Sequence, residues 1–164
     1  MTRALIQAEI VTILKTVTDI GSVHNGVRWA VYEDKFIQDF FSVINDEKQI
    51  RTWMITRVEG GVDYGARNGS LGSGIPITTQ GGLERYDFTM EGWASFKDDD
   101  TDTEFQALID SVIDAFEAKV SLNSTANMRG PIQYSIDHQF FGDYFVHHVI
   151  FSFYAIEVKN LSIT

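Results

Sequence analysis

The chain has 164 residues, a length typical of one domain, and its 44% apolar and 13% aromatic residues are typical of a folded protein. Its formal net charge of −10 argues against a dedicated DNA- or RNA-binding role, because such affinity normally comes from Lys and Arg side chains that neutralise phosphates. The absence of cysteine excludes disulfides, thiol nucleophiles and sulfur-rich zinc sites, and it fits a reducing cytoplasm.

Membrane association is not expected from the sequence. No stretch approaches the ~18 apolar residues of a membrane span. The N-terminal segment MTRALIQAEIVTILKTV carries polar residues every few positions and lacks the pattern of a signal peptide. We therefore expect a protein that is made in the cytoplasm and has no membrane partner.

The first third of the chain predicts two helices and a strand. Apolar residues recur at helical spacing over 3–17 and again over 34–44, and the turn-rich connector VHNGVRWAVYED (23–34) separates them. RTWMITRV (51–58) is rich in β-branched and aromatic residues, which predicts a strand. A glycine-rich excursion with eight glycines follows over 59–82.

The segment 84–96 has the clearest strand pattern in the chain. Apolar side chains share one face of this predicted strand, namely Tyr86, Phe88, Met90, Ala94 and Phe96. Charged and polar side chains from Arg85 to Glu91 share the other face, and Trp93 falls on this polar side. A large aromatic side chain at such a position indicates that something covers that face.

The last third predicts one helix and two strands. A T-x-x-E capping box, Thr101 and Glu104, precedes apolar residues at helical spacing, which predicts a helix over 102–119. The segment 132–140 alternates, with Ile132, Tyr134, Ile136 and Phe140 on one face. The segment 143–158 is apolar on both sides, so we expect a central strand whose two faces are covered by helices or by another subunit.

These elements predict one α+β domain over 1–164, in which helices pack on a mostly antiparallel sheet and 59–82 forms a long flexible arm. Helices should cover one face of the sheet and leave the other partly available for a partner. There is no internal repeat and no sign of a second domain.

The acidic run KDDDTDTE (97–104) opens like a calcium-binding loop, with Asp98, Asp100 and Asp102. The glycine and glutamate that such a loop needs at its sixth and twelfth positions are replaced by Thr103 and Ile109. Acidic residues are also typical of a helix N-terminus, where they stabilise the positive end of the helix dipole. We therefore expect a helix start or an acidic docking face, and no metal.

The histidines do not predict a catalytic site. His147 and His148 are neighbours on a predicted strand, so they should point to opposite faces and cannot easily bind one metal. His138 aligns with the apolar face of its strand, where a core histidine is expected, and alternation separates it from Asp137. No nucleophile elbow or carboxylate pair is recognisable, so we expect no enzymatic activity and no cofactor.

The glycine-rich excursion does not match a phosphate-binding loop. GSLGSG (69–74) lacks the following Lys-Ser/Thr of a P-loop, and no helix begins after it. Loops longer than ~15 residues tend to be functional or disordered, so an idle flexible loop remains one interpretation. We favour an arm that becomes ordered on a partner, through Tyr64, Arg67, Ile75, Pro76 and Ile77.

Four stretches of the chain form a recognisable series: VHNGVRWAVYEDKFIQDFF (23–41), RTWMITR (51–57), FTMEGWASF (88–96) and DDDTDTEFQALIDSVIDAF (98–116). Together they resemble the tail-terminator and tail-completion proteins of long-tailed phages, and the resemblance covers most of 3–122. Beyond residue 122 only the paired terminal strands match. The chain departs from the family pattern where Asn25, Gly26 and Val27 replace an expected Asp-Tyr-Glu.

The resemblance implies a structural virion protein in the tail-neck region, assembled in the host cytoplasm. Such proteins form a ring, commonly of six subunits, that caps the tail tube and joins the tail to the head or neck. The implied partners are further copies of the chain, the tail-tube protein and a head or neck connector, with DNA passing through the lumen without specific binding. The expected interface residues are Arg28, Trp29, Arg57, Tyr64, Arg67, Ile75, Ile77, Trp93, Asp98, Asp99, Asp100 and Asp102.

Charge constrains such a ring. Six copies would carry a formal charge on the order of −60, since each carries −10, so closure requires apolar contacts or complementary patches. Four arginines are candidates to meet the acidic run of a neighbouring subunit: Arg28, Arg51, Arg57 and Arg85.

Two alternative functions remain open. A head-completion or neck connector, or a relative of the tail-tube protein, shares ring geometry and an acidic lumen with a terminator. More distantly, a small ligand-binding domain or enzyme would use His138, His147 or the acidic cluster, and would need a pocket with converging polar groups.

Deletion of 62–80 tests the interpretation of the arm. We expect a folded monomer, measured by circular dichroism and gel filtration, that no longer assembles, because the contacts of the arm are lost while the strands remain. A deletion variant that assembles normally would show that the arm is dispensable.

Overall fold

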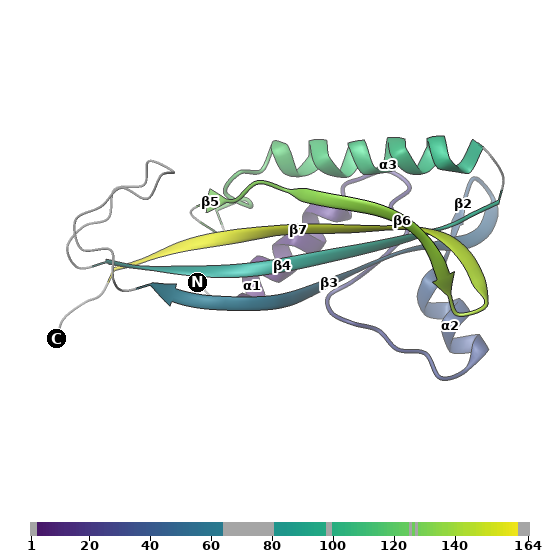
Figure 1. The fold of residues 1–164 in the computed structure, drawn as a ribbon, viewed down its shortest axis with the longest axis horizontal. Helices are drawn as coiled ribbons and strands as arrows, with labels where there is room; N and C mark the ends of the chain where they lie inside the picture. Colours follow the sequence, from purple (N-terminus) through teal and green to yellow (C-terminus); the bar gives the residue numbers. More distant parts are fainter. Residues whose placement is uncertain (1–2, 64–80, 98–99, 125, 127, 161–164) are drawn as a thin grey trace.

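The computed structural model describes residues 3–63, 81–97, 100–124, 126 and 128–160, and for 57–63, 81–83, 128 and 158–160 it describes the backbone alone (Figure 1). The helices are α1 (Arg3–Leu14), α2 (Glu33–Phe40) and α3 (Asp100–Glu117). The strands are β1 (Ser22–His24), β2 (Phe41–Ile44), β3 (Glu47–Asp63), β4 (Gly81–Ser95), β5 (Met128–Arg129), β6 (Gln133–Phe141) and β7 (Tyr144–Asn160).

The strands form one sheet in which β4 and β7 are central. The order is β1-β3-β4-β7-β5, with β6 also paired to β7 and β2 paired to β3. Every pair is antiparallel except the short parallel pair of β1 with β3. This confirms the predicted α+β fold with a mostly antiparallel sheet packed by helices, and the central position of the last strand.

Helices α1 and α3 cover one face of the sheet. The apolar stripe of α3 is buried as predicted, including Phe105, Ile109 and Phe116, and α1 contributes Ile6 and Ile10. These side chains pack on the aromatic residues that β3, β4 and β7 direct to the same face, namely Trp53, Tyr86, Phe88, Phe151 and Phe153. The main hydrophobic core therefore lies between this face and the two helices.

Among the described residues, the other face is covered at one end, where α2 lies (Figure 1). Phe40 of α2 packs with Met54, Trp93 and Val146 in a second apolar cluster. Farther along this face the side chain of Ser152 is exposed. A shallow hollow of about 410 Å³ lies there, and Arg85, Asp87, Ser152 and Tyr154 are among its lining residues. The expectation that helices leave one face partly available is confirmed.

The second predicted helix, 34–44, is wrong in its C-terminal part, since α2 ends at Phe40 and 41–44 forms β2. The reason is the turn that follows. Asn45 and Asp46 both have positive φ, 51° and 63°, and they connect Ile44 directly to its partner Glu47. Two-residue hairpin turns favour this left-handed backbone, which Asn and Asp tolerate.

Three other boundaries differ from prediction. The first helix ends at Leu14 instead of residue 17, and α3 begins at Asp100, which places Thr101 in the first turn and not at the N-cap. The excursion 59–82 is shorter at both ends, because 59–63 continue β3 and 81–82 begin β4. The remainder of the predicted arm lies outside the described residues.

Gly92 tests the packing of the core. It lies opposite Trp53 in the β3–β4 pairing, and a Cβ atom there would be 2.8 Å from two atoms of the indole ring. We expect Gly92→Ala to lower the free energy of unfolding by about 1–3 kcal/mol, because Trp53 is fully buried and cannot move freely. Thermal and urea unfolding would measure it. Thr89→Ala, on the opposite face of β4, is the control, and equal stability of both variants would contradict this packing.

Candidate interaction surface

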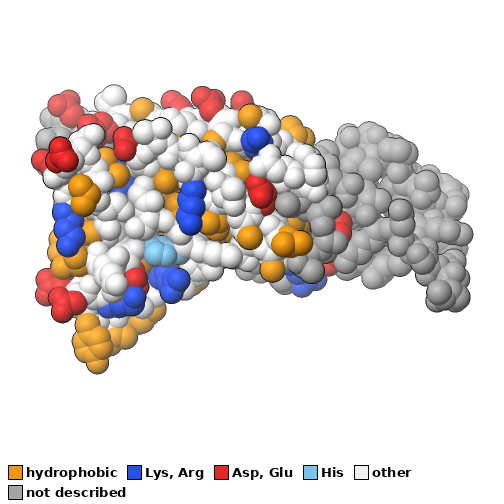
Figure 2. Space-filling model, turned by 180° about the vertical axis from the view of Figure 1, so that it is seen from behind, with side chains coloured by type: hydrophobic (Ala, Val, Ile, Leu, Met, Phe, Trp, Pro, Cys, Tyr) orange, Lys and Arg blue, Asp and Glu red, His pale blue; other side chains and the backbone are white. Residues whose placement is uncertain are grey.

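Exposed hydrophobic side chains gather at the end of the molecule that carries α2 (Figure 2). Trp29 is 83% exposed, and its neighbours Val27, Val31 and Tyr32 are also largely exposed. Phe140, near the end of β6, is 71% exposed and lines the same hollow of about 350 Å³ as Trp29. We call these five residues, Val27, Trp29, Val31, Tyr32 and Phe140, the apolar ridge.

The chain around the ridge is held in place by packing beneath it. Phe36 and Phe40 of α2 lie with ring centroids 5.0 Å apart, and each contacts Phe141. The backbone N–H of Arg28 donates to Met54 Sδ over 3.4 Å. His24 Nε2 donates to the Asp39 carbonyl over 2.7 Å. The segment is therefore anchored from inside the protein while its large apolar side chains project outward.

Two predicted interface residues, Arg28 and Trp29, lie on or beside this ridge and are exposed. Val27, Val31, Tyr32 and Phe140 were not predicted as interface residues from the sequence. The signal was present in the connector, because its large apolar residues match neither a helical stripe nor a covered strand. For Phe140, alternation placed it with Ile136 on an apolar face, but β6 is an edge strand and this end of it is not covered.

Trp93 is not an interface residue. It is 6% exposed and stacks on Phe141 and His148, with ring centroids 4.9 and 5.1 Å away. The inference that something covers its face is confirmed, but the cover is the chain's own α2 cluster, so Trp93 is removed from the candidates.

Two of the four candidate arginines are engaged within the chain. Arg51 is 6% exposed and its guanidinium donates to the Asp19 carbonyl over 3.4 Å, so the expectation that it meets a neighbouring subunit is wrong. Arg85 donates to its own Asp87 over 2.6 Å and lies over the Tyr154 ring, at 4.1 Å from the centroid. Among the four, Arg28 has an exposed side chain without such an ion pair in the described part of the chain.

The remaining predicted interface residues divide into two groups. Asp100 and Asp102 are exposed in the first turn of α3. The others lie outside the described residues, or have side chains that do: Arg57, Tyr64, Arg67, Ile75, Ile77, Asp98 and Asp99.

Helix α3 presents an acidic outer face. Its exposed carboxylates are Asp100, Asp102, Glu104, Asp110, Asp114 and Glu117, and the helix contains no Lys or Arg. Acidic side chains gather along the α3 edge of the molecule in Figure 2. Asp114 and Glu117 lie in the last turns, where negative charge opposes the helix dipole. Stabilisation of the helix therefore does not explain why the C-terminal half of α3 is acidic.

The neighbours His147 and His148 point to opposite faces of β7, as predicted. His147 is fully buried on the α3 side, where its ring stacks on Phe105 with centroids 5.1 Å apart. Burial, with a smaller contribution from nearby His138, lowers the pKa of His147. His138 itself is exposed, so the prediction of a core histidine there is wrong, for the same reason as for Phe140: β6 is an edge strand.

His148 lies on the α2 side in a different environment. Its Nδ1 is 2.7 Å from Asp137 Oδ1, and its Nε2 is 3.5 Å from Glu91 Oε2. Burial alone would lower the pKa of His148, but the two carboxylates outweigh it and raise the pKa above the ordinary value. Asp137 and His148 are directly paired across β6 and β7, which explains why they meet.

The chain has no match among known protein families. No curated protein matches its sequence either. Within the described part of the chain, none of the helices has the length and hydrophobicity needed to cross a membrane.

The His148 pair predicts a pH-dependent stability. Because the folded protein binds the His148 proton more tightly than the unfolded chain, this contribution is complete below pH ~6.5 and is lost as the pH rises through the folded pKa. We expect Asp137→Asn to lower the free energy of unfolding by about 1 kcal/mol at pH 6 and by less at pH 9. Asp143→Asn, at an exposed position in the neighbouring turn, is the control. A loss independent of pH in urea unfolding would contradict the assignment.

Proposed function

We propose that this protein is a structural virion protein that assembles as a ring at the neck end of a phage tail, caps the tail tube and joins it to the head or neck. The observation that carries the proposal is the apolar ridge, which is exposed on an acidic chain whose sequence resembles tail-terminator and tail-completion proteins.

The composition of the ridge favours a protein partner. Monomeric proteins rarely expose large contiguous apolar patches, and such patches typically mark interaction sites. Trp, Tyr and Arg are enriched among residues that dominate binding energy, and Trp29, Tyr32 and Arg28 occur here within one short segment. Because the Arg28 backbone N–H is bonded to Met54 and the rings beneath the segment are packed, its backbone loses little conformational freedom on binding.

The arrangement of the two ends is suited to a ring. A ring of identical subunits requires two different, complementary surfaces on each copy. The ridge lies at one end of the sheet, and the strand ends that bracket 64–80 lie at the opposite end (Figure 1). In the proposed ring, the ridge of one subunit binds the neighbouring subunit near the arm that connects β3 and β4.

The acidic face of α3 supports a position beside passing DNA. Six exposed carboxylates on one helix repel phosphates, so a lumen lined by this face lets DNA pass without binding it. The ridge, by contrast, supplies apolar contacts that are not weakened by the net charge.

A head-completion or neck connector, and a tail-tube relative, remain the nearest alternatives, because a ring with an acidic lumen serves them equally. In each case the chain is a structural component without enzymatic activity or cofactor.

One arrangement of side chains resembles a catalytic triad. Thr101 Oγ1 lies 3.1 Å from His147 Nε2, and His147 Nδ1 lies 3.7 Å from Asp102 Oδ1, which is the order of a nucleophile, a base and an orienting carboxylate. His147 has no exposed surface, however, and Thr101 Oγ1 also accepts the Lys97 backbone N–H over 3.4 Å. The imidazole therefore offers no exposed surface to an ester or amide substrate, and we do not propose hydrolytic chemistry.

Trp29→Ala tests the proposed function. Because Trp29 is 83% exposed, we expect the free energy of unfolding to change by less than about 0.5 kcal/mol, while the yield of intact virions falls at least about tenfold. Electron microscopy of particles made with the variant would measure assembly, and circular dichroism would measure stability.

The matched control is Val120→Ala, since Val120 is an exposed apolar residue beyond the end of α3 and away from the ridge. It should leave assembly unchanged. Normal virion yield with a folded Trp29→Ala protein would exclude the ridge as an assembly surface.

A further inference from the structure

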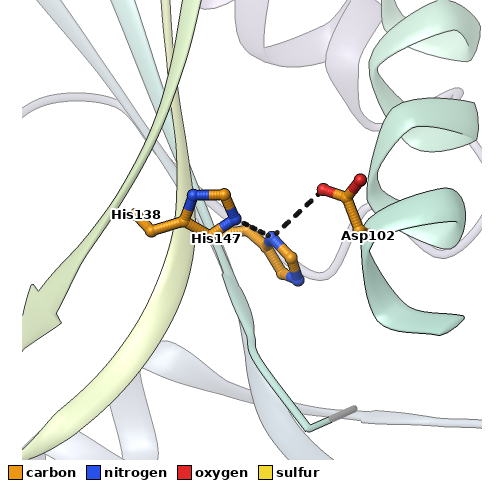
Figure 3. A group of neighbouring side chains, drawn as sticks. All are labelled: Asp102, His138 and His147. Carbon is orange, nitrogen blue, oxygen red and sulfur yellow. Dashed lines mark hydrogen bonds and ion pairs between the residues drawn. The ribbon is translucent and has the colours of Figure 1, made fainter. Parts of the chain in front are cut away.

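We propose that Asp102, His138 and His147 form a binding site for a divalent transition metal such as Zn²⁺, which links the first turn of α3 to the β6–β7 hairpin (Figure 3). The sequence does not predict this site, because Asp102 belongs to an acidic run that fails the calcium-loop pattern, and His147 was paired with His148, whose ring lies on the opposite face.

The fold brings the three side chains together from separate elements. His138 and His147 are directly paired across β6 and β7, so both rings lie on the same face of the sheet. Asp102 projects from the first turn of α3, which packs over this face. The site therefore depends on one cross-strand register and on the position of one helix.

The separations suit a metal with short bonds. His147 Nδ1 lies 3.1 Å from His138 Nε2 and 3.7 Å from Asp102 Oδ1. The three ligand atoms all lie within 4.8 Å of one another. Bonds of about 2.0–2.2 Å to Zn²⁺ place tetrahedral ligands about 3.3 Å apart. The adjustment falls on His138 and Asp102, whose side chains are both exposed.

A second contact orients the central ligand. Thr101 Oγ1 lies 3.1 Å from His147 Nε2 and accepts that ring N–H, which leaves the Nδ1 lone pair directed toward His138 and Asp102. Histidine ligands commonly donate their other ring N–H in this way, which fixes the tautomer. Phe96 and Phe105 flank the His147 ring, at 4.8 and 5.1 Å between centroids, and hold it in place.

The donor set selects the class of ion. Two imidazole nitrogens with one carboxylate oxygen suit Zn²⁺, Co²⁺, Ni²⁺ or Cu²⁺, whereas Ca²⁺ and Mg²⁺ prefer oxygen ligands. The side chain of Asp102 is 54% exposed, so the site is open to solvent and a water molecule can complete a tetrahedral shell. The metal-free alternative is a hydrogen bond from His138 Nε2–H to His147 Nδ1, which requires no contribution from Asp102.

Titration of the purified full chain with Co²⁺ and Zn²⁺ tests the site. We expect one Co²⁺ per chain with a visible absorption band typical of tetrahedral nitrogen and oxygen coordination, displaced by Zn²⁺. Zn²⁺ should also raise the melting temperature, since it binds the folded form. Failure to bind one equivalent, or an octahedral spectrum identical to that of free Co²⁺, would overturn the proposal.

Variants assign the ligands. His138→Ala and Asp102→Asn, at exposed positions, should each reduce affinity at least about tenfold while circular dichroism shows an unchanged fold. Asp110→Asn, at another exposed position on α3, is the control and should bind as the wild type does. Equal affinity of His138→Ala and the wild type would place the metal elsewhere and contradict the site.

Thr101→Val separates the positioning contact from the ligands. Removal of the hydroxyl should lower affinity about 10–100-fold and alter the Co²⁺ spectrum without changing the stoichiometry. An unchanged affinity and spectrum would contradict the role of Thr101. None of these measurements depends on the protein being a virion component.

Discussion

The pairing of β4 with β7 is the constraint on which the rest of the structure depends. The register, from Gly81 opposite Asn160 to Ser95 opposite Val146, aligns the aromatic residues of both strands on the face covered by α1 and α3. The same register places Trp93 opposite His148 on the other face, where α2 covers them. A slip by one residue would exchange the two sets, exposing the core aromatics and burying charged side chains, so the register is strongly specified.

The register also creates two unlike histidine environments from adjacent residues. β6 continues the alternation of β7, so Asp137 meets His148 on one face and His138 meets His147 on the other. Carboxylates around His148 stabilise its charged form, whereas burial of His147 disfavours charge, and their pKa values shift in opposite directions. The Nδ1 of His147 lies near His138 and Asp102, as the proposed metal site requires, whereas His148 is half of an ion pair with Asp137. The two roles follow from strand geometry and not from any local motif.

The spacing of apolar residues predicted the elements that have one buried face. The helical stripe of α3 and the alternation of β4 each lie within one continuous segment, so they can be recognised locally. Asn45 and Asp46 are residues typical of a two-residue hairpin turn, but the apolar run that continues through Ile44 favoured the prediction of a longer helix. Contacts between distant segments could not be predicted, because they depend on how the elements pack. Examples are the cover of Trp93 by α2, the burial of Arg51, and the approach of Asp102 to His147. Burial on an edge strand could not be predicted either. Alternation shows that Phe140 and His138 share one face of β6, but it does not show whether another element covers that face.

The molecule has an exposed apolar ridge at one end and an acidic helix along one edge. From these surfaces and the resemblance in sequence, we propose that this chain completes a phage tail at the neck. Electron microscopy of particles produced without the gene tests that claim most directly. A terminator predicts overlong tail tubes detached from heads, and tails of normal length that fail to join heads would indicate a neck connector instead. Normal virions in normal yield would contradict the account.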